Sequence, residues 1–231
     1  MSAPANPNSL DGGLDRLYAA RFSDREREAR ARLWRALCSS FLSRYITPQA
    51  TVLDLGAGYC DLINCVRSQR RIAVDLNPDM PRFAEPGVET HVAPLPALAT
   101  LLEPASVDVA FASNVFEHLR GPDSLLEVLA VVRSILRPGG RLIVLQPNVR
   151  LVGGAFWDFF DHTLPLTEKG MSEALTVAGF RVVERRARFL PYTTKSRLPQ
   201  VPLLVRLYLA FPPAQWLLGK QMLVVAERPR S

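Results

Sequence analysis

Cysteine is scarce in this chain, which has only 3 in 231 residues, an odd number with no Cys-x-x-Cys pair among them. This scarcity excludes a disulfide framework and argues against a structural zinc site. No stretch approaches the roughly 18 consecutive apolar residues that a membrane span needs. Residues 1–13 lack the basic-then-apolar layout of a secretory signal and are expected to form a disordered leader. Together these absences favour a protein of the reducing cytoplasm.

Lysine is also rare, because only Lys169, Lys195 and Lys220 occur among the 28 basic residues that leave a net charge of +6. The arginines are scattered rather than gathered into one basic arm. Their densest run, residues 16–35, alternates with acidic and apolar positions, as on the solvated face of a helix. A nucleic-acid partner, which needs a concentrated basic patch, is therefore not favoured.

Short apolar runs alternate with helical patterns along most of the chain, after a helical cap at residues 14–46. Strands are predicted at 51–55, 71–75, 89–92, 107–111, 141–145, 181–184 and 221–226. Helical patterns cover 62–66, 122–136 and a segment that starts after the potential cap Thr167, and Pro138-Gly139-Gly140 is expected to turn the chain between two elements. This alternation predicts one α/β domain over residues 14–231, with a mostly parallel sheet covered on both faces.

A glycine loop, Gly56-Ala57-Gly58, stands where the first predicted strand should pass into the next element. Asp54 precedes the loop, and Asp75 ends the second predicted strand 21 residues further on. Asn114 follows the fourth predicted strand. Because the carboxyl ends of parallel strands meet at one edge of the sheet, these polar groups should lie together there. Asp75 is then placed to accept hydrogen bonds from the hydroxyls of a ribose.

A dinucleotide fingerprint requires a third glycine five residues after Gly56, and Asp61 occupies that position. An aspartate there would repel the pyrophosphate that such a loop normally receives at a helix N-terminus. A nucleoside that carries a sulfonium and an amino-acid tail suits the loop better than a diphosphate does.

Four blocks of this sequence, at residues 52–58, 73–77, 106–119 and 136–144, resemble the class I S-adenosylmethionine-dependent methyltransferases of the type 11-like group. The resemblance implies a Rossmann-like, doubly wound sheet of seven strands whose last strand is antiparallel. It also implies S-adenosylmethionine as cofactor and S-adenosylhomocysteine as product. The implied cofactor contacts are Asp54, Leu55, Gly56, Ala57 and Gly58 near the amino-acid end, Asp75 and Leu76 near the ribose, Ala93 and Pro94 near the adenine, and Asn114.

Two positions depart from the pattern that many relatives of this family share. Cys60 stands where they have a third glycine, so we expect a slight change of the loop. Residues 92–95 contain no acid to bind the adenine amine. Adenine would then be held by backbone groups and apolar packing.

Methyl transfer from a sulfonium is an in-line displacement that depends mainly on orientation, with a base where the acceptor must lose a proton. Residues 157–163 concentrate aromatic side chains with Asp161 and His162, so His162, ahead of Asp161, is the candidate base. The alternative is an aromatic cluster that anchors the loop. His118 is expected to pack or cap, and no metal site is predicted.

Residues 189–220 form an insertion expected to cover the substrate mouth, and shallow docking on a bilayer is the alternative. The resemblance favours a bacterial enzyme that methylates oxygen or nitrogen of a small-molecule or sugar- or lipid-linked acceptor, as monomer or homodimer. Two other functions stay open. One is a non-catalytic, cofactor-binding regulatory subunit, and the other is a nicotinamide oxidoreductase.

Overall fold

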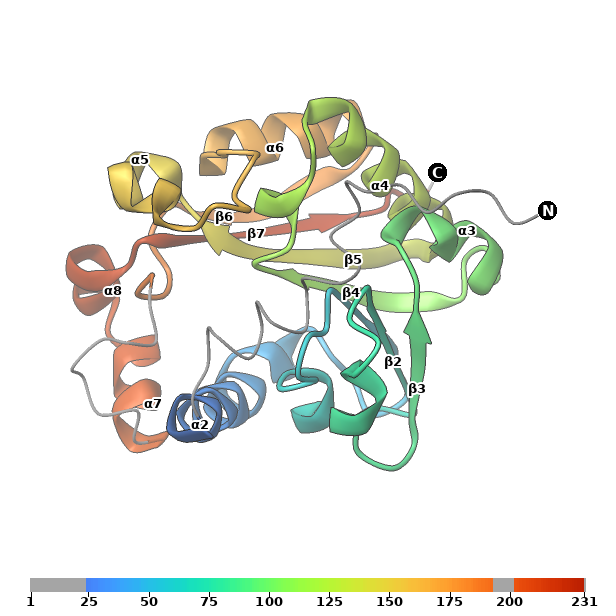
Figure 1. Cartoon of the computed structure of the whole chain (residues 1–231), viewed down its shortest axis with the longest axis horizontal. Helices are drawn as coiled ribbons and strands as arrows, with labels where there is room; N and C mark the ends of the chain where they lie inside the picture. The colour runs from blue at the N-terminus through green and yellow to red at the C-terminus, as the bar shows by residue number, and fades with distance from the viewer. Residues whose placement is uncertain (1–23, 193–201, 231) are drawn as a thin grey trace.

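The computed structural model describes residues 24–192 and 202–230, which build a sheet of seven strands in the order β3-β2-β1-β4-β5-β7-β6 (Figure 1). The strands are β1 (Thr51–Leu55), β2 (Arg70–Asp75), β3 (Val88–Val92), β4 (Val107–Ser113), β5 (Leu136–Pro147), β6 (Arg181–Arg186) and β7 (Gln221–Glu227). Neighbouring strands from β3 to β5 pair in parallel, whereas β7 pairs antiparallel with both β5 and β6. The predicted Rossmann-like sheet with an antiparallel last strand is confirmed.

Helices cover both faces of this sheet. They are α2 (Asp24–Ser40), α3 (Leu98–Leu101), α4 (Pro122–Ile135), α5 (Val149–Val152), α6 (Glu168–Val177), α7 (Pro202–Ala210) and α8 (Pro212–Leu218). Short 3₁₀ turns lie at Leu42–Arg44, Ile63–Cys65, Met80–Phe83, Leu95–Ala97, Phe116–His118 and Gly153–Asp158. Figure 1 shows α4 and α6 above the sheet and α2 and α7 below it.

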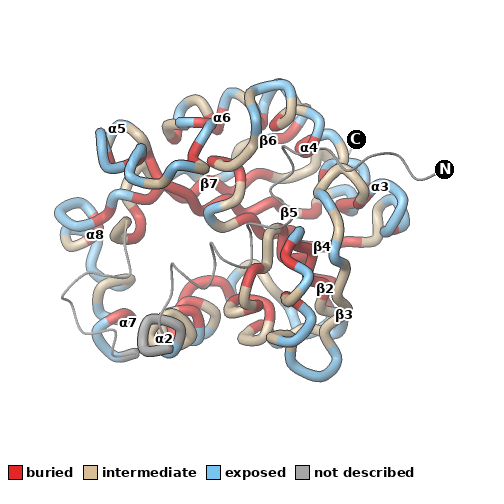
Figure 2. The backbone as a smooth tube through the Cα atoms, in the orientation of Figure 1, coloured by how far each residue is buried: buried red, intermediate tan, exposed pale blue. Residues whose placement is uncertain are grey.

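Two hydrophobic clusters form the core, one on each face of the sheet. Leu53 and Leu55 of β1 belong to the cluster under α3, α4 and α6, whereas Val52 belongs to the cluster under α2. This alternation follows from the two-residue period of a strand, which sends successive side chains to opposite faces. All five residues of β1 are buried, and Figure 2 shows buried backbone along the middle of the molecule at β4, β5 and β7.

Two predicted helical segments differ from the structure. Within the predicted cap at 14–46, the described helix is Asp24–Ser40 with a 3₁₀ turn after it, and residues 14–23 and the leader lie outside the described residues. The pattern at 62–66 forms only the 3₁₀ turn Ile63–Cys65, so the helix predicted there is wrong. The chain must reach the start of β2 at Arg70, which leaves no room for a longer helix after the loop.

The strand predicted at 141–145 is longer than expected, because β5 runs from Leu136 to Pro147 and includes Pro138-Gly139-Gly140. Val107 pairs with Leu136 and Val109 with Arg141, so β5 carries an excursion of extra residues opposite β4. Gly139 has a φ of +82°, a conformation that glycine adopts without strain. The expected turn is therefore present as an irregularity within the strand.

Helix α6 starts with the predicted cap, because Thr167 accepts a hydrogen bond from the backbone N–H of Gly170 at 3.1 Å. Thr167→Ala should lower the free energy of unfolding by about 1 kcal/mol, since this N–H then loses its acceptor. Thr176→Ala in the same helix is the control, because the Thr176 hydroxyl only donates to the Ser172 carbonyl. Chemical denaturation would measure both, and equal losses would contradict the capping role.

Candidate functional site

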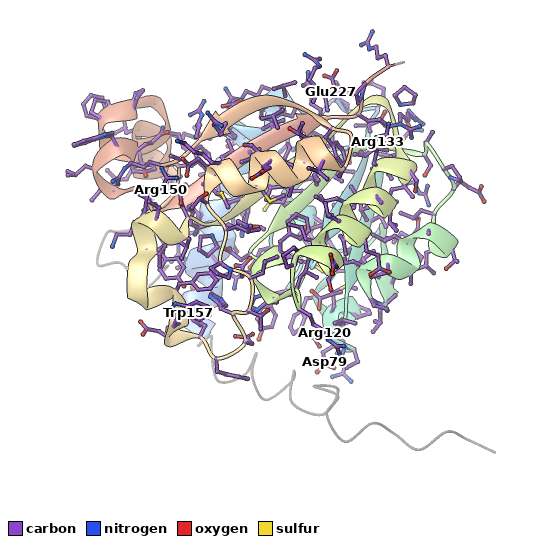
Figure 3. All side chains as sticks on the ribbon, turned by 90° about the horizontal axis from the view of Figure 1, so that it is seen from above. Asp79, Arg120, Arg133, Arg150, Trp157 and Glu227 are labelled. Atoms are coloured by element: carbon purple, nitrogen blue, oxygen red, sulfur yellow. The ribbon has the colours of Figure 1, made fainter. Side chains whose placement is uncertain are left out.

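The segments that follow the carboxyl ends of several strands lie at one edge of the molecule. Asp79, Arg120 and Trp157 follow β2, β4 and β5, and Figure 3 shows them along one edge of the molecule. Arg133 and Glu227 lie toward the opposite edge in the same view. The edge with Asp79, Arg120 and Trp157 is the carboxyl edge, at which open α/β sheets bind their ligands.

The glycine loop is held against the end of β2. The backbone N–H groups of Gly56 and Ala57 both donate to the Val74 carbonyl, at 2.8 and 3.1 Å. Gly56 has a φ of +67°, and a Cβ atom built there would lie 2.4 Å from Val115 Cγ2. Only glycine fits this position, because a larger residue would meet both a backbone restriction and a side chain.

Asp75 connects the end of β2 to the glycine loop. Its carboxylate accepts hydrogen bonds from the backbone N–H groups of Gly58 at 2.7 Å and of Asn77 at 2.8 Å. The residue is only 6% exposed, so it is not the solvated turn aspartate that such a position could otherwise hold. The carboxylate is thus oriented by the backbone before a ligand arrives.

Carboxylates concentrate around the loop. Asp54, 3% exposed, has a pKa raised well above its ordinary value of 3.8, first by burial and then by the charges of Asp75 and Asp61. Burial also raises the pKa of Asp75, although the N–H groups of Asn77, Gly58 and Leu76 oppose the shift. A cationic ligand would relieve this repulsion, whereas an anionic one would add to it.

The raised pKa values predict that S-adenosylmethionine binds more tightly as pH rises. A cation favours the ionised carboxylates, so binding should release protons, with a gain of up to about tenfold per pH unit for each proton released. The same groups make the ligand-free protein lose stability as pH rises from 3.8 through the raised pKa of Asp54. Calorimetric titrations between about pH 5.5 and about pH 8, in buffers of different ionisation enthalpy, would measure both affinity and proton release.

Asp54→Asn is the matched variant for this titration, because it removes one titrating group and keeps the size of the side chain. Its affinity should depend less on pH than that of the unaltered protein. An unaltered protein whose affinity is independent of pH, with no proton release, would contradict the assignment of these carboxylates to the binding site.

Asp61, the residue that replaces the third glycine, lies beside a cation. Arg30 Nε of α2 lies 3.2 Å from Asp61 Oδ2, so the helix that precedes the sheet contacts the glycine loop. The ion pair offsets part of the charge that a diphosphate would meet. The argument against a dinucleotide therefore rests more on Asp54 and Asp75 than on Asp61 alone.

Cys60, the other departure in the loop, adopts a backbone conformation that few residues other than glycine adopt. Its φ is +59°, in the left-handed region that favours glycine, and its side chain is fully buried. The expectation of only a slight change of the loop agrees with this geometry.

The predicted adenine contacts lie beside Asp75. The backbone N–H of Ala93 donates to the Asp75 carbonyl at 3.0 Å, which fixes residues 92–95 against the end of β2. Leu76 and Val92 are 54% and 49% exposed, an unusual position for large apolar side chains at a strand end. They offer a surface for an adenine ring without an acid.

The remaining predicted cofactor contacts differ in exposure. The Leu55 side chain is fully buried in the core, so only its backbone faces the loop region. Asn114 is exposed, adopts a φ of +52°, and donates from its side chain to the Ser113 hydroxyl at 3.3 Å. Pro94 is exposed as well.

Two histidines and Asp161 meet where β4 ends. His118 Nδ1 lies 3.2 Å from Asp161 Oδ2 and 3.1 Å from the Asp161 carbonyl oxygen. The ring of His162 lies 5.0 Å from that of His118 and stacks on Phe159 at 4.9 Å. The aspartate that the sequence placed beside His162 is therefore hydrogen-bonded to His118, which the sequence had assigned to packing.

The surroundings of His118 raise its pKa, and its side chain is more exposed than that of His162. Burial lowers the pKa of His118, but the hydrogen bond to Asp161 and the charges of Glu117 and Asp161 outweigh it, so the pKa is raised from 6.5. The charge of His118 in turn lowers the pKa of Asp75, although burial raises it more. The His118 side chain is 32% exposed, whereas His162 is 7% exposed.

Glu117, His118 and His162 each offer a potential ligand atom for a metal ion, and these atoms lie within 4.8 Å of one another. The sequence alone showed no such cluster, because His162 is 44 residues from His118. The absence of a metal stays a prediction, since displacement at a sulfonium needs no Lewis acid. Elemental analysis of the purified protein would test it.

The comparisons with known proteins agree with this geometry. Residues 53–142 match the family model described as a methyltransferase domain, a stretch that includes the glycine loop, Asp75 and His118. Over these residues the chain matches a methyltransferase domain, as the sequence predicted, and S-adenosylmethionine is the cofactor of that class.

Solved structures with the same fold come from several organisms. An S-adenosylmethionine-dependent methyltransferase from Archaeoglobus fulgidus is 20% identical, with a TM-score of 0.60 over 84% of this chain and 94% of its own. One from Thermotoga maritima is 16% identical, with a TM-score of 0.64 over 95% and 97%. The methyltransferase complex with the Trm112 activator of Haloferax volcanii gives 18% identity and a TM-score of 0.66 over 97% and 100%.

A further relative is an uncharacterized 37.1 kDa protein in transposon TN4556 of Streptomyces fradiae, 33% identical over 112 residues. The match covers 44% of this chain and 31% of that protein, so the chain spans about a third of its length. The relative therefore says nothing about acceptor or partner.

Proposed function

We propose that the protein transfers the methyl group of S-adenosylmethionine to oxygen or nitrogen of a small-molecule or sugar- or lipid-linked acceptor, by in-line displacement. The single observation that supports this best is the carboxylate of Asp75, which two backbone N–H groups orient beside the glycine loop. A ribose needs such an acceptor, and the neighbouring Asp54 suits the positive charge of the sulfonium and ammonium groups.

In this proposal each end of the cofactor meets a different set of groups. Asp54 and the backbone of residues 55–58 face the amino-acid end, and Asp75 accepts from the ribose hydroxyls. Leu76, Ala93 and Pro94 pack against the adenine, and Asn114 lies on the side from which the acceptor approaches. When bound, the cofactor supplies the electrophilic methyl group, and the residues only orient it.

For the acceptor's proton we propose His118, with Asp161 as its positioning residue. A histidine oriented by a carboxylate through Nδ1 can take a proton at Nε2, and its partly exposed ring can meet an acceptor. His162, the base predicted from the sequence, lies among Phe156, Phe159 and the His118 ring. His162 stays the competing candidate for the base, and the variants His118→Gln and His162→Gln distinguish the two histidines.

The alternatives find less support. A regulatory subunit would not need the carboxylates of Asp54 and Asp75 buried close to each other, an arrangement that costs stability without a ligand. A nicotinamide cofactor would bring two phosphates close to these carboxylates. The free cysteines Cys38, Cys60 and Cys65 suit a reducing cytoplasm, which belongs to the proposal together with a monomeric or homodimeric state.

Native mass spectrometry of the purified protein tests the cofactor directly, by the added mass of S-adenosylmethionine or S-adenosylhomocysteine. Calorimetric titration of ligand-free protein with S-adenosylhomocysteine should give saturable binding. NAD and NADP serve as the comparison, and binding of either at about micromolar concentration would overturn the proposal.

A further inference from the structure

Helices α7 and α8 expose a large apolar surface, which we call the α7–α8 surface. Its side chains are between 38% and 71% exposed and comprise Leu203, Leu204, Leu207, Phe211, Trp216, Leu217 and Leu218. An open groove of about 510 Å³ between the helices is lined by Leu207, Tyr208, Ala210, Phe211 and Ala214. Contiguous exposed apolar side chains of this kind are typical of an interaction surface.

The opposite side of both helices is fixed to the protein. Val205 of α7 is buried, and the Tyr208 hydroxyl donates to the Phe189 carbonyl at 2.7 Å. Gln215 of α8 is 5% exposed, and its side chain donates to the Leu209 carbonyl at 2.9 Å. Because the inner sides of both helices are anchored in this way, the leucines of the α7–α8 surface and Trp216 point away from the protein.

The sequence of this part of the chain carries charge of one sign only. No acidic residue occurs in the 42 residues between Glu184 and Glu227, a stretch with 7 basic residues, although the chain has 22 acidic residues in total. Arg206 and Lys220 are exposed at the two helices, and the Arg188 guanidinium lies 5.8 Å from the centre of the Trp216 ring. An anionic partner meets no repulsion there.

We propose that the α7–α8 surface docks onto the surface of an anionic phospholipid bilayer. Leucine, phenylalanine and tryptophan can enter the region between headgroups and acyl chains, while arginine and lysine contact the lipid phosphates. Among the described residues no helix has the length and hydropathy to cross a bilayer, so the contact is peripheral. A second copy of the chain fits less well, because two copies of a basic stretch that has no acids of its own would meet.

The surface lies at the end of the sheet that holds the candidate active site. Helix α8 leads into β7, whose first residue Gln221 pairs with Pro147 at the carboxyl end of β5. Figure 1 shows α7 and α8 at this end, with α5 at the same side. Docking would bring the end of the sheet that holds the candidate active site toward the lipid–water interface, where a lipid-linked acceptor resides. This last step rests on the proposed function, whereas docking itself does not.

Sedimentation with sucrose-loaded vesicles tests the docking on the full chain. We expect the protein to sediment with vesicles of phosphatidylcholine and phosphatidylserine at about 7:3, and at least about tenfold less with phosphatidylcholine alone or at about 0.5 M salt. Leu217→Glu should lower vesicle binding by about tenfold or more, since it places an anion in the apolar surface. Val177→Glu is the matched control, because Val177 of α6 is 69% exposed, like Leu217.

Leu217→Glu should keep the melting temperature and the affinity for S-adenosylhomocysteine, so loss of docking and loss of cofactor binding are distinguishable. Absence of sedimentation with the anionic vesicles would overturn the docking, and so would equal losses in the two variants. Light scattering tests whether a second copy of the chain covers this surface instead. A dimer that Leu217→Glu dissociates would assign this surface to a second copy and overturn the proposal.

Discussion

Asp75→Ala is expected to weaken binding of S-adenosylhomocysteine by roughly 2–4 kcal/mol, or about 30- to 1,000-fold, because two ribose hydroxyls lose one charged acceptor. The structure adds a second cause. The carboxylate also accepts from the N–H groups of Gly58 and Asn77, so its removal takes away one of the ties between the glycine loop and β2. Calorimetry on the folded variant would measure the loss, and Asp75→Asn, which keeps one acceptor oxygen, should lose less.

The control for this variant is Asp108→Ala at the opposite edge of the sheet. Asp108 also accepts from a backbone N–H, that of Thr51 at 2.7 Å, and pairs with Arg137 at 2.9 Å. Its removal should lower the melting temperature and leave cofactor affinity unchanged. If Asp75→Ala behaved in the same way, with a lower melting temperature and full affinity, Asp75 would hold the loop and not the ribose.

The fold and the grouping of Asp54, the glycine loop and Asp75 could be predicted because their signals are local. Gly56, Gly58 and the preceding Asp54 lie within five residues, and the next strand ends at Asp75. Parallel topology alone then brings the strand ends together. Buried apolar runs identified the strands, although they could not reveal that β5 continues through its Pro-Gly-Gly segment, because Gly139 and Gly140 there bond to the backbone of Arg228, far away in sequence.

The cluster of His118, Asp161 and His162 could not be predicted in the same way, because it depends on contacts between distant segments. The backbone N–H groups of Thr163 and Leu164 both donate to the Glu117 carbonyl, at 2.8 and 3.0 Å. These bonds draw the loop back along the end of β4 and bring Asp161 to His118, 43 residues away in sequence. Neither hydrophobic periodicity nor a local motif reports such a contact. The contact of Asp161 with His118 therefore had no signal in the sequence, and the roles of Asp161 and His162 stay predictions.

The largest effect on turnover is expected at the two neighbouring imidazoles. Replacing the base should lower turnover by about 10²- to 10⁴-fold, while cofactor affinity stays nearly constant. We expect this loss for His118→Gln and a smaller one for Asp161→Asn, which weakens the orientation and positive charge of His118. The loss should shrink as pH rises if the acceptor ionises by itself. A panel of phenols, sugars, amines and lipid-linked saccharides, scored by release of S-adenosylhomocysteine, must first identify an acceptor.

His162→Gln decides between the two histidines. If His162 is the base, as the sequence predicted, this variant should show the large loss and His118→Gln a modest one. If His162 only anchors the loop, its replacement should lower the melting temperature and raise KM, with little effect on kcat. His91→Gln is the matched control, because His91 on β3 is bonded to Glu89, away from this cluster. Should turnover survive both His118→Gln and His162→Gln within a few-fold, neither imidazole takes the proton, and orientation alone carries the reaction.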